Sequence, residues 1–188
     1  MTTFRGFIAV DVEAFEQLEA FEQAIRTTGA NVKLVEPHNV HITLKFLGET
    51  QESHIDEIEQ IMKDAVADVT PFDLRLNGSG VFPNEQYIKV IWIGIESGEP
   101  LGPIAQRLDD GLTRLSYKKE RRGFSPHLTI GRVKTAREKE RLLEVIASYR
   151  DKEFATIPVK SIRLMKSDLT PKGPIYTIMR EVPIPEYD

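Results

Sequence analysis

Two short segments of this chain place a histidine two residues ahead of a threonine: "HITL" at residues 41–44 and "HLTI" at residues 127–130. The chain has only four histidines, so half of them fall in one four-residue pattern. Imidazole takes up and releases protons near neutral pH, and a hydroxyl group hydrogen-bonds to anionic oxygens. The pattern therefore suits phosphoryl chemistry, in which a proton moves while charge on the non-bridging oxygens is stabilised.

Both segments have the apolar character of β-strands, in which successive side chains point to opposite faces. His41 and Thr43 then share one face, Ile42 and Leu44 share the other, and the second segment repeats this arrangement. Two residues along a strand span about 6.6 Å. An imidazole and a hydroxyl at this spacing can contact different oxygens of one phosphate group.

One such motif alone would more often be a hydrogen-bonded structural histidine than a catalytic one. Two copies far apart in the chain have no local structural reason, and each places polar groups in an apolar strand, where they must be satisfied. A shared pocket explains both. In it, one neutral histidine can accept a proton and one protonated histidine can donate one, while Thr43 and Thr129 hold phosphate oxygens. This scheme requires no metal.

Composition limits the remaining classes of function. The 188 residues carry a formal net charge of -4, which argues against coating nucleic acid by bulk electrostatics, so any such contact must be local. The absence of cysteine rules out disulfides, thiolate zinc sites and a cysteine nucleophile. No segment reaches the roughly 18 apolar residues of a membrane span, and the first residues lack a secretory pattern. We expect a cytoplasmic protein in which residues 1–188 form a single two-lobed domain.

The hydrophobic pattern alternates strands with helices. It predicts helices over residues 15–28, 55–69, 101–115 and 138–149, and strands over residues 4–12, 32–35, 40–47, 72–76, 87–95, 128–133, 154–166 and 174–182. Turns are expected at residues 78–80 and 83–84. The order is compatible with a coarse duplication in which each half supplies one histidine strand. A glycine-rich phosphate loop is missing, so we predict an α+β sandwich and not a doubly wound sheet.

The two complete motifs match the paired H-x-T-x motifs of the two-histidine phosphoesterases. Their surroundings, "HITLKFLGE", "GVFPN", "VIWIGIE" and "FSPHLTIGRVK", resemble the RNA 2',3'-cyclic phosphodiesterases, also called 2'-5' RNA ligases. The resemblance spans nearly the whole chain. It implies a bilobal, pseudo-duplicated α+β fold, with two antiparallel sheets flanking a central cleft and helices on the outside.

The resemblance also implies an activity, the hydrolysis of a terminal 2',3'-cyclic phosphate of RNA to a 2'-phosphate. By this analogy His41 donates a proton to the departing 3'-oxygen, His127 activates water, and Arg132 contacts the phosphate. Reversal with a 5'-hydroxyl in place of water would form a 2'-5' linkage. No cofactor is implied, and we expect a monomer. A tRNA fragment, another RNA and a small cyclic nucleotide all remain open as the natural substrate.

Strand alternation and local charge suggest further substrate contacts. Lys45 falls on the face of His41 and Thr43, and Arg122 belongs to the basic run "YKKERRGF" at 117–124, which could hold an RNA backbone or be a solvated loop. Phe124 and Phe82 are candidates for stacking on a base. Phe46 falls on the apolar face with Ile42, so core packing is expected there.

Several residues and two other classes of function need separate consideration beside the enzyme hypothesis. Arg132 does not follow from simple alternation after His127, and Gly131 could introduce a bulge that redirects it. His38 and His41 are three residues apart and so on opposite faces of a strand, which disfavours a metal site, and His54 reads as a solvated residue at a helix start. A non-catalytic protein that binds an RNA end, or a metal-dependent hydrolase, would use the same cleft differently.

Overall fold

Apolar residues at helical spacing form the helices of this fold, and each helix buries its apolar side. In α1, Leu18, Phe21 and Ile25 are buried, and the helix ends just before Gly29, which has a positive φ of 74°. The computed structural model describes residues 2–187. Its α-helices are α1 (Glu16–Thr27), α2 (Ile55–Val66), α3 (Leu101–Leu112) and α4 (Lys139–Ser148), and its 3-10 turns are η1 (Pro37–Asn39), η2 (Glu52–His54) and η3 (Thr113–Leu115).

The strands form two sheets in which every neighbouring pair is antiparallel. The four-stranded sheet has the order β3 (His41–Gln51), β1 (Thr3–Asp11), β8 (Ser161–Thr170) and β9 (Gly173–Pro183). The five-stranded sheet has the order β2 (Val32–Leu34), β6 (His127–Val133), β5 (Ile88–Glu96), β4 (Phe72–Pro83) and β7 (Glu153–Val159). The two histidine motifs thus belong to different sheets.

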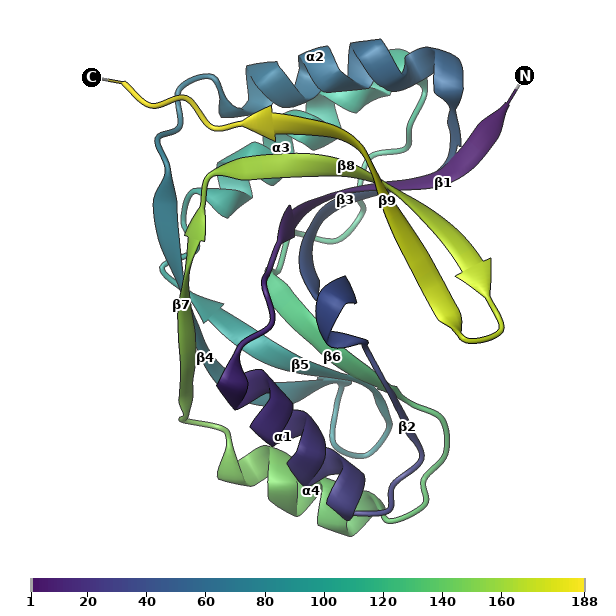
Figure 1. Cartoon of the computed structure of the whole chain (residues 1–188), viewed down its shortest axis with the longest axis vertical. Coiled ribbons are helices and arrows are strands. Elements are labelled where there is room, and N and C mark those ends of the chain that lie inside the picture. Colours follow the sequence, from purple (N-terminus) through teal and green to yellow (C-terminus); the bar gives the residue numbers. More distant parts are fainter. Residues whose placement is uncertain (1, 188) are drawn as a thin grey trace.

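Each sheet carries two helices on its outer side (Figure 1). Helices α2 and α3 pack together against the four-stranded sheet, and α1 and α4 lie against the five-stranded sheet. Ile8, Val10 and Ile42 are buried on the outer face of the first sheet, as are Leu74 and Leu76 in the second. Among the described residues, no α-helix covers the inner face of either sheet, and between the two faces lies the cleft described below. The predicted α+β architecture with two antiparallel sheets flanking a cleft is confirmed.

One predicted strand and one predicted turn need correction. The segment 154–166 is not one strand but two, because β7 pairs with β4 in one sheet and β8 pairs with β1 in the other. The chain crosses between lobes at Lys160, which the uniform alternation of the sequence does not reveal. Residues 78–80 are not a turn but lie within β4, where a register shift accommodates Gly78 and its positive φ of 74°.

Candidate active site

Strands β3 and β6 bring the two histidines and the two threonines into one cleft between the sheets. His41, Thr43, His127 and Thr129 all line it. The four-stranded sheet also contributes Arg5, Phe7, Phe46, Ser167 and Tyr176, and the five-stranded sheet with its edge contributes Lys33, Leu34, Arg132 and Lys134. The predicted meeting of two distant motifs is therefore what the fold produces.

The two histidines are held in the same way. Nδ1 of His41 lies 2.7 Å from the backbone oxygen of Asn39, and Nδ1 of His127 lies 2.8 Å from that of Ser125. A carbonyl oxygen can only accept, so each Nδ1 carries the proton and donates it. This tautomer leaves the lone pair of each Nε2 available to accept a proton. In both cases the partner is the residue two positions upstream, so this support is also duplicated.

Both strands contain a bulge directly after the threonine. In the pairing of β3 with β1, Thr43 lies opposite Ala9 and Lys45 lies opposite Ile8, with one unpaired residue between them on β3. In the pairing of β6 with β5, Thr129 lies opposite Trp92 and Gly131 lies opposite Ile91, again with one unpaired residue between them on β6. One extra residue in each strand reverses the alternation that follows it. The proposed bulge at Gly131 is present, and it turns Arg132 toward the cleft, where Arg132 is a lining residue.

The same bulge in β3 makes the prediction for Lys45 wrong. Lys45 lies on the outer face, is only 6% exposed, and contacts Asp109 of α3 at 2.5 Å. Its ammonium also donates to the backbone oxygen of Lys118 at 2.8 Å. A buried charge must be paired in this way, so Lys45 joins β3 to α3 and to the following loop instead of contacting substrate.

Phe46 is displaced in the opposite direction, and the expectation of core packing is wrong. Its side chain is 50% exposed and lines the cleft, with the Arg5 guanidinium 5.0 Å from the ring centroid. Strand alternation from Ile42 predicts that Phe46 faces the core, but the bulge reverses the alternation before Phe46. An exposed aromatic ring in such a cleft is a surface on which a base can stack.

The cleft carries more positive charge than the chain as a whole. Its lining includes Arg5, Lys33, Arg132, Lys134 and Lys172, against the single carboxylate of Glu36. These cations come from β1, β2, β6, the residue after β6 and the turn between β8 and β9, so they form no local run in the sequence. A chain with a net charge of -4 thus concentrates its cations where a phosphate would bind.

Two other predicted contacts, Arg122 and Phe124, do not line the cleft. Arg122 lies in the exposed loop before β6, and Phe124 is partly buried against the hydrophobic core. In the same loop, the ammonium of Lys119 pairs with Asp110 at 2.6 Å, and the peptide of Lys118 is tied to Lys45. The basic run is therefore partly neutralised by α3, which favours its interpretation as a solvated loop.

Aromatic rings pack against both histidines. The Phe7 and Tyr176 rings lie 4.8 and 5.3 Å from that of His41, and the Phe82 ring lies 5.0 Å from that of His127, edge to face. Phe82, a candidate for base stacking, also contacts Trp92. Its position next to His127 supports a role in fixing that imidazole.

The surroundings of His41 oppose its charged form. Burial lowers the pKa of His41 below its usual value of 6.5, while the hydrogen bond to Asn39 and the carboxylate of Asp11 act in the raising direction. Asp11 stands directly opposite His41 in the β1–β3 register. Asn39 further anchors this region, since its side-chain amide donates to the Pro174 oxygen at 3.0 Å.

The two remaining histidines, His38 and His54, do not line the cleft. His38 lies in η1, in agreement with a connecting segment, and borders a separate cavity next to His41. His54 ends η2 and packs edge-on against Tyr117, so it is less solvated than expected. Over residues 2–187, no cluster of three or more potential metal ligands is found. Within the same range, none of the helices has the length and apolarity to cross a membrane.

Comparisons with known proteins agree with this geometry. Residues 11–171 match the family model described as the 2'-5' RNA ligase superfamily. The chain is 41% identical over 179 residues to an RNA 2',3'-cyclic phosphodiesterase of Methanocaldococcus jannaschii, covering 94% of this chain and 99% of that one. It is 37% identical over 177 residues to the protein of that name from Methanothermobacter thermautotrophicus, covering 93% and 96% of the two chains.

Solved structures show the same fold. The chain superposes on TT0787 of Thermus thermophilus with a TM-score of 0.73 and 27% identity, covering 96% of this chain and 97% of that one. Escherichia coli LigT complexed with 3'-AMP gives a TM-score of 0.72 at 21% identity, with 98% and 100% covered. Family model, relatives, fold and paired histidine motifs agree, and the chain belongs to the 2'-5' RNA ligase superfamily.

Proposed function

We propose that this chain is an RNA 2',3'-cyclic phosphodiesterase that hydrolyses the cyclic end to a 2'-phosphate without a metal. The observation that carries the proposal is the matched support of His41 and His127. Each Nδ1 donates to a backbone oxygen, which leaves each Nε2 to exchange protons in one cleft. The relatives bearing the name RNA 2',3'-cyclic phosphodiesterase support the substrate class.

The two imidazoles divide the proton transfers of a displacement at phosphorus. The water oxygen forms a bond to phosphorus while Nε2 of His127 accepts the water proton. The bond from phosphorus to the 3'-oxygen breaks, and Nε2 of His41 donates its proton to that oxygen, leaving a 2'-phosphate. Thr43, Thr129 and Arg132 supply donors for the non-bridging oxygens as charge develops on them.

The assignment of His41 as the acid requires its protonated form, which burial disfavours in the free protein. A bound phosphate supplies a negative charge beside the ring, and an opposite charge within a few ångströms favours the imidazolium. The cations of the cleft attract the RNA end, while Phe46 offers a stacking surface for the terminal base. Binding of substrate thus prepares the acid that the reaction needs.

The test is turnover of an oligonucleotide with a 2',3'-cyclic end, with the product position identified as a 2'-phosphate. We expect activity to survive EDTA, to show a bell-shaped pH profile, and to collapse in His41→Ala and His127→Ala while binding persists. His54→Ala is the matched control, because His54 lies outside the cleft. Loss of turnover in EDTA would indicate a metal-dependent hydrolase, and binding without turnover in the wild type would indicate an RNA-end binding protein.

Ligation is a separate prediction of the same scheme. A 5'-hydroxyl in place of water would attack the cyclic phosphate, His127 would accept its proton, and a 2'-5' linkage would form. We also expect the chain to work as one domain, because the cleft needs both sheets, and as a cytoplasmic monomer. Its substrates would be RNA fragments, including those of tRNA, or cyclic nucleotides. Incubation of cyclic-ended and 5'-hydroxyl oligonucleotides at high concentration tests the ligation.

A further inference from the structure

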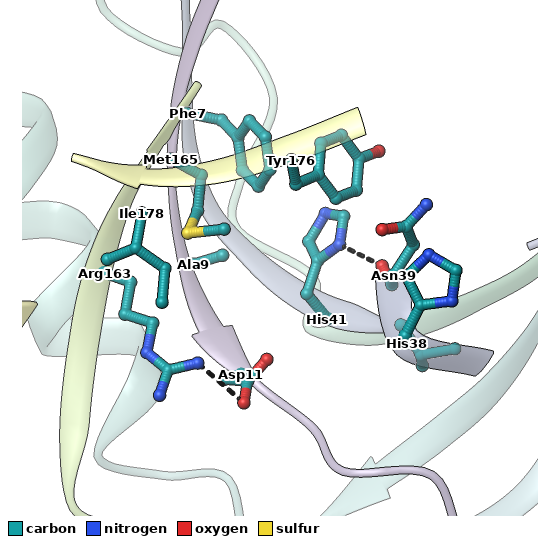
Figure 2. A pocket seen from close by; sticks show the side chains of 11 residues that line it. Phe7, Ala9, Asp11, His38, Asn39, His41, Arg163, Met165, Tyr176 and Ile178 are labelled. Atoms are coloured by element: carbon teal, nitrogen blue, oxygen red, sulfur yellow. Dashed lines mark hydrogen bonds and ion pairs between the residues drawn. The ribbon is translucent and has the colours of Figure 1, made fainter. Parts of the chain in front are cut away.

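A second cavity, here called the side cavity, opens next to His41 on the inner face of the four-stranded sheet (Figure 2). Its volume is about 290 Å³, and strands β1, β8 and β9 line it together with η1 and the start of β3. Phe7, Asn39, His41 and Tyr176 border both this cavity and the catalytic cleft. A ligand bound at the phosphate site can therefore extend past His41 into it.

The side cavity differs from the cleft in its charge. Arg163 lines it, but its guanidinium is paired with Asp11 at 2.7 Å and with Glu181 at 3.0 Å. Figure 2 shows the contact between Arg163 and Asp11 at the end of the cavity away from Tyr176. With two carboxylates around this cation, the region does not favour a second phosphate. It suits a neutral group with a polar edge.

The walls of the side cavity are apolar and aromatic. Phe7, Met165, Tyr176 and Ile178 line it, and Ile178 is 49% exposed. A planar ring can pack against such residues and against the fixed guanidinium plane of Arg163, which stacks well on bases. The carboxylate of Asp11 can accept hydrogen bonds from an amino group at the edge of that ring. These are the properties of a nucleobase subsite.

We propose that the side cavity binds the nucleobase one position upstream of the cyclic end of the RNA. This inference rests on the proposed function, in which His41 faces the 3'-oxygen and hence the ribose, while His127 faces the attacking water. The RNA chain continues upstream from that ribose. Its next nucleotide therefore lies on the side of His41, where the side cavity begins. Phe46, on the β3 strand within the cleft, is left for the terminal base.

The experiment compares two substrates with the same terminal base, a 2',3'-cyclic mononucleotide and a dinucleotide with a 2',3'-cyclic end. The variants are Ile178→Ala, which removes part of the wall, and Ile178→Trp, which fills the cavity. Ile175→Ala and Ile175→Trp are the matched controls, because Ile175 is on the same strand, is 58% exposed, and does not line the cavity. For each protein, kcat/KM is measured with both substrates.

We expect Ile178→Trp to lower kcat/KM for the dinucleotide about tenfold, the size of a lost base contact, and to leave the mononucleotide within about twofold. Ile178→Ala should give a smaller loss in the same direction, and the Ile175 variants should change neither value. Equal losses with both substrates, or no loss with either, would overturn the upstream subsite. Absence of turnover by the wild type on both substrates would instead reject the proposed function, before any variant is compared.

Discussion

Strands β3 and β6 are alike up to their bulges and different after them. Each strand presents a histidine and a threonine to the cleft. In each strand, the first residue after the bulge points outward and the second points inward. In β3 these residues are Lys45 and Phe46, whereas in β6 they are Gly131 and Arg132. The duplicated backbone thus presents a histidine and a threonine from both lobes, but an aromatic ring from one and a cation from the other.

The largest expected effect tests the shared part of this comparison. His41→Ala and His127→Ala should each lower kcat on a cyclic-ended oligonucleotide by about 10²–10⁴-fold, the usual contribution of a positioned acid or base. The double variant should lose little more than either single variant, because the two rings act as a unit. Additive losses, measured in single-turnover experiments, would mean that the histidines serve separate steps.

The outward residues of the two bulges should differ in their contribution to stability. Asp109 is almost buried, and Lys45→Met removes its ammonium partner. We therefore expect the free energy of unfolding to fall by about 3 kcal/mol. Gly131→Ala places a methyl group 2.8 Å from Val32 of the edge strand β2, which should cost about 1–2 kcal/mol. Urea denaturation measures both, and a Lys45→Met protein as stable as the wild type would contradict a structural role for this pair.

Substitutions of the two inward residues, Phe46 and Arg132, should differ in how their effects depend on salt concentration. Phe46→Ala should lower kcat/KM about tenfold through lost stacking, and the loss should be similar at all ionic strengths. Arg132→Ala should weaken binding of the RNA end and reduce the slope of log affinity against log salt by about one, because one phosphate contact is removed. If both variants had the same salt slope, the inward residues of the two bulges would not divide into one that stacks on a base and one that contacts a phosphate.

The smallest effect concerns the burial of His41. Titration followed by NMR should show its ring with a midpoint below 6.5 in the free protein, since burial disfavours the imidazolium. Asp11→Asn should lower the midpoint further, because that carboxylate acts in the raising direction, and inorganic phosphate should raise it. Because the unfolded state takes up this proton more readily, the protein should lose stability as pH falls through this range. A midpoint above 6.5 without phosphate would contradict this picture.

The sequence by itself determined the helices and the placement of histidine and threonine on one face of a strand. Apolar spacing located the helices, and the repeated histidine and threonine identified the residues that two distant strands bring to one cleft. These features are local, or depend on the face of a single strand, so they are visible in the order of residues. The bulge at Gly131 was also foreseeable, because glycine often marks such a site.

Only the tertiary structure decided which neighbours join the site. The bulge of β3 between Thr43 and Lys45 contains no glycine, so no local signal in the sequence predicted that Lys45 would pair with Asp109 and that Phe46 would enter the cleft. The cations of the cleft and the walls of the side cavity come from strands that meet only when the sheets assemble. A one-residue register shift is set by the pairing of strands, and a partner strand cannot be read from the segment that it displaces.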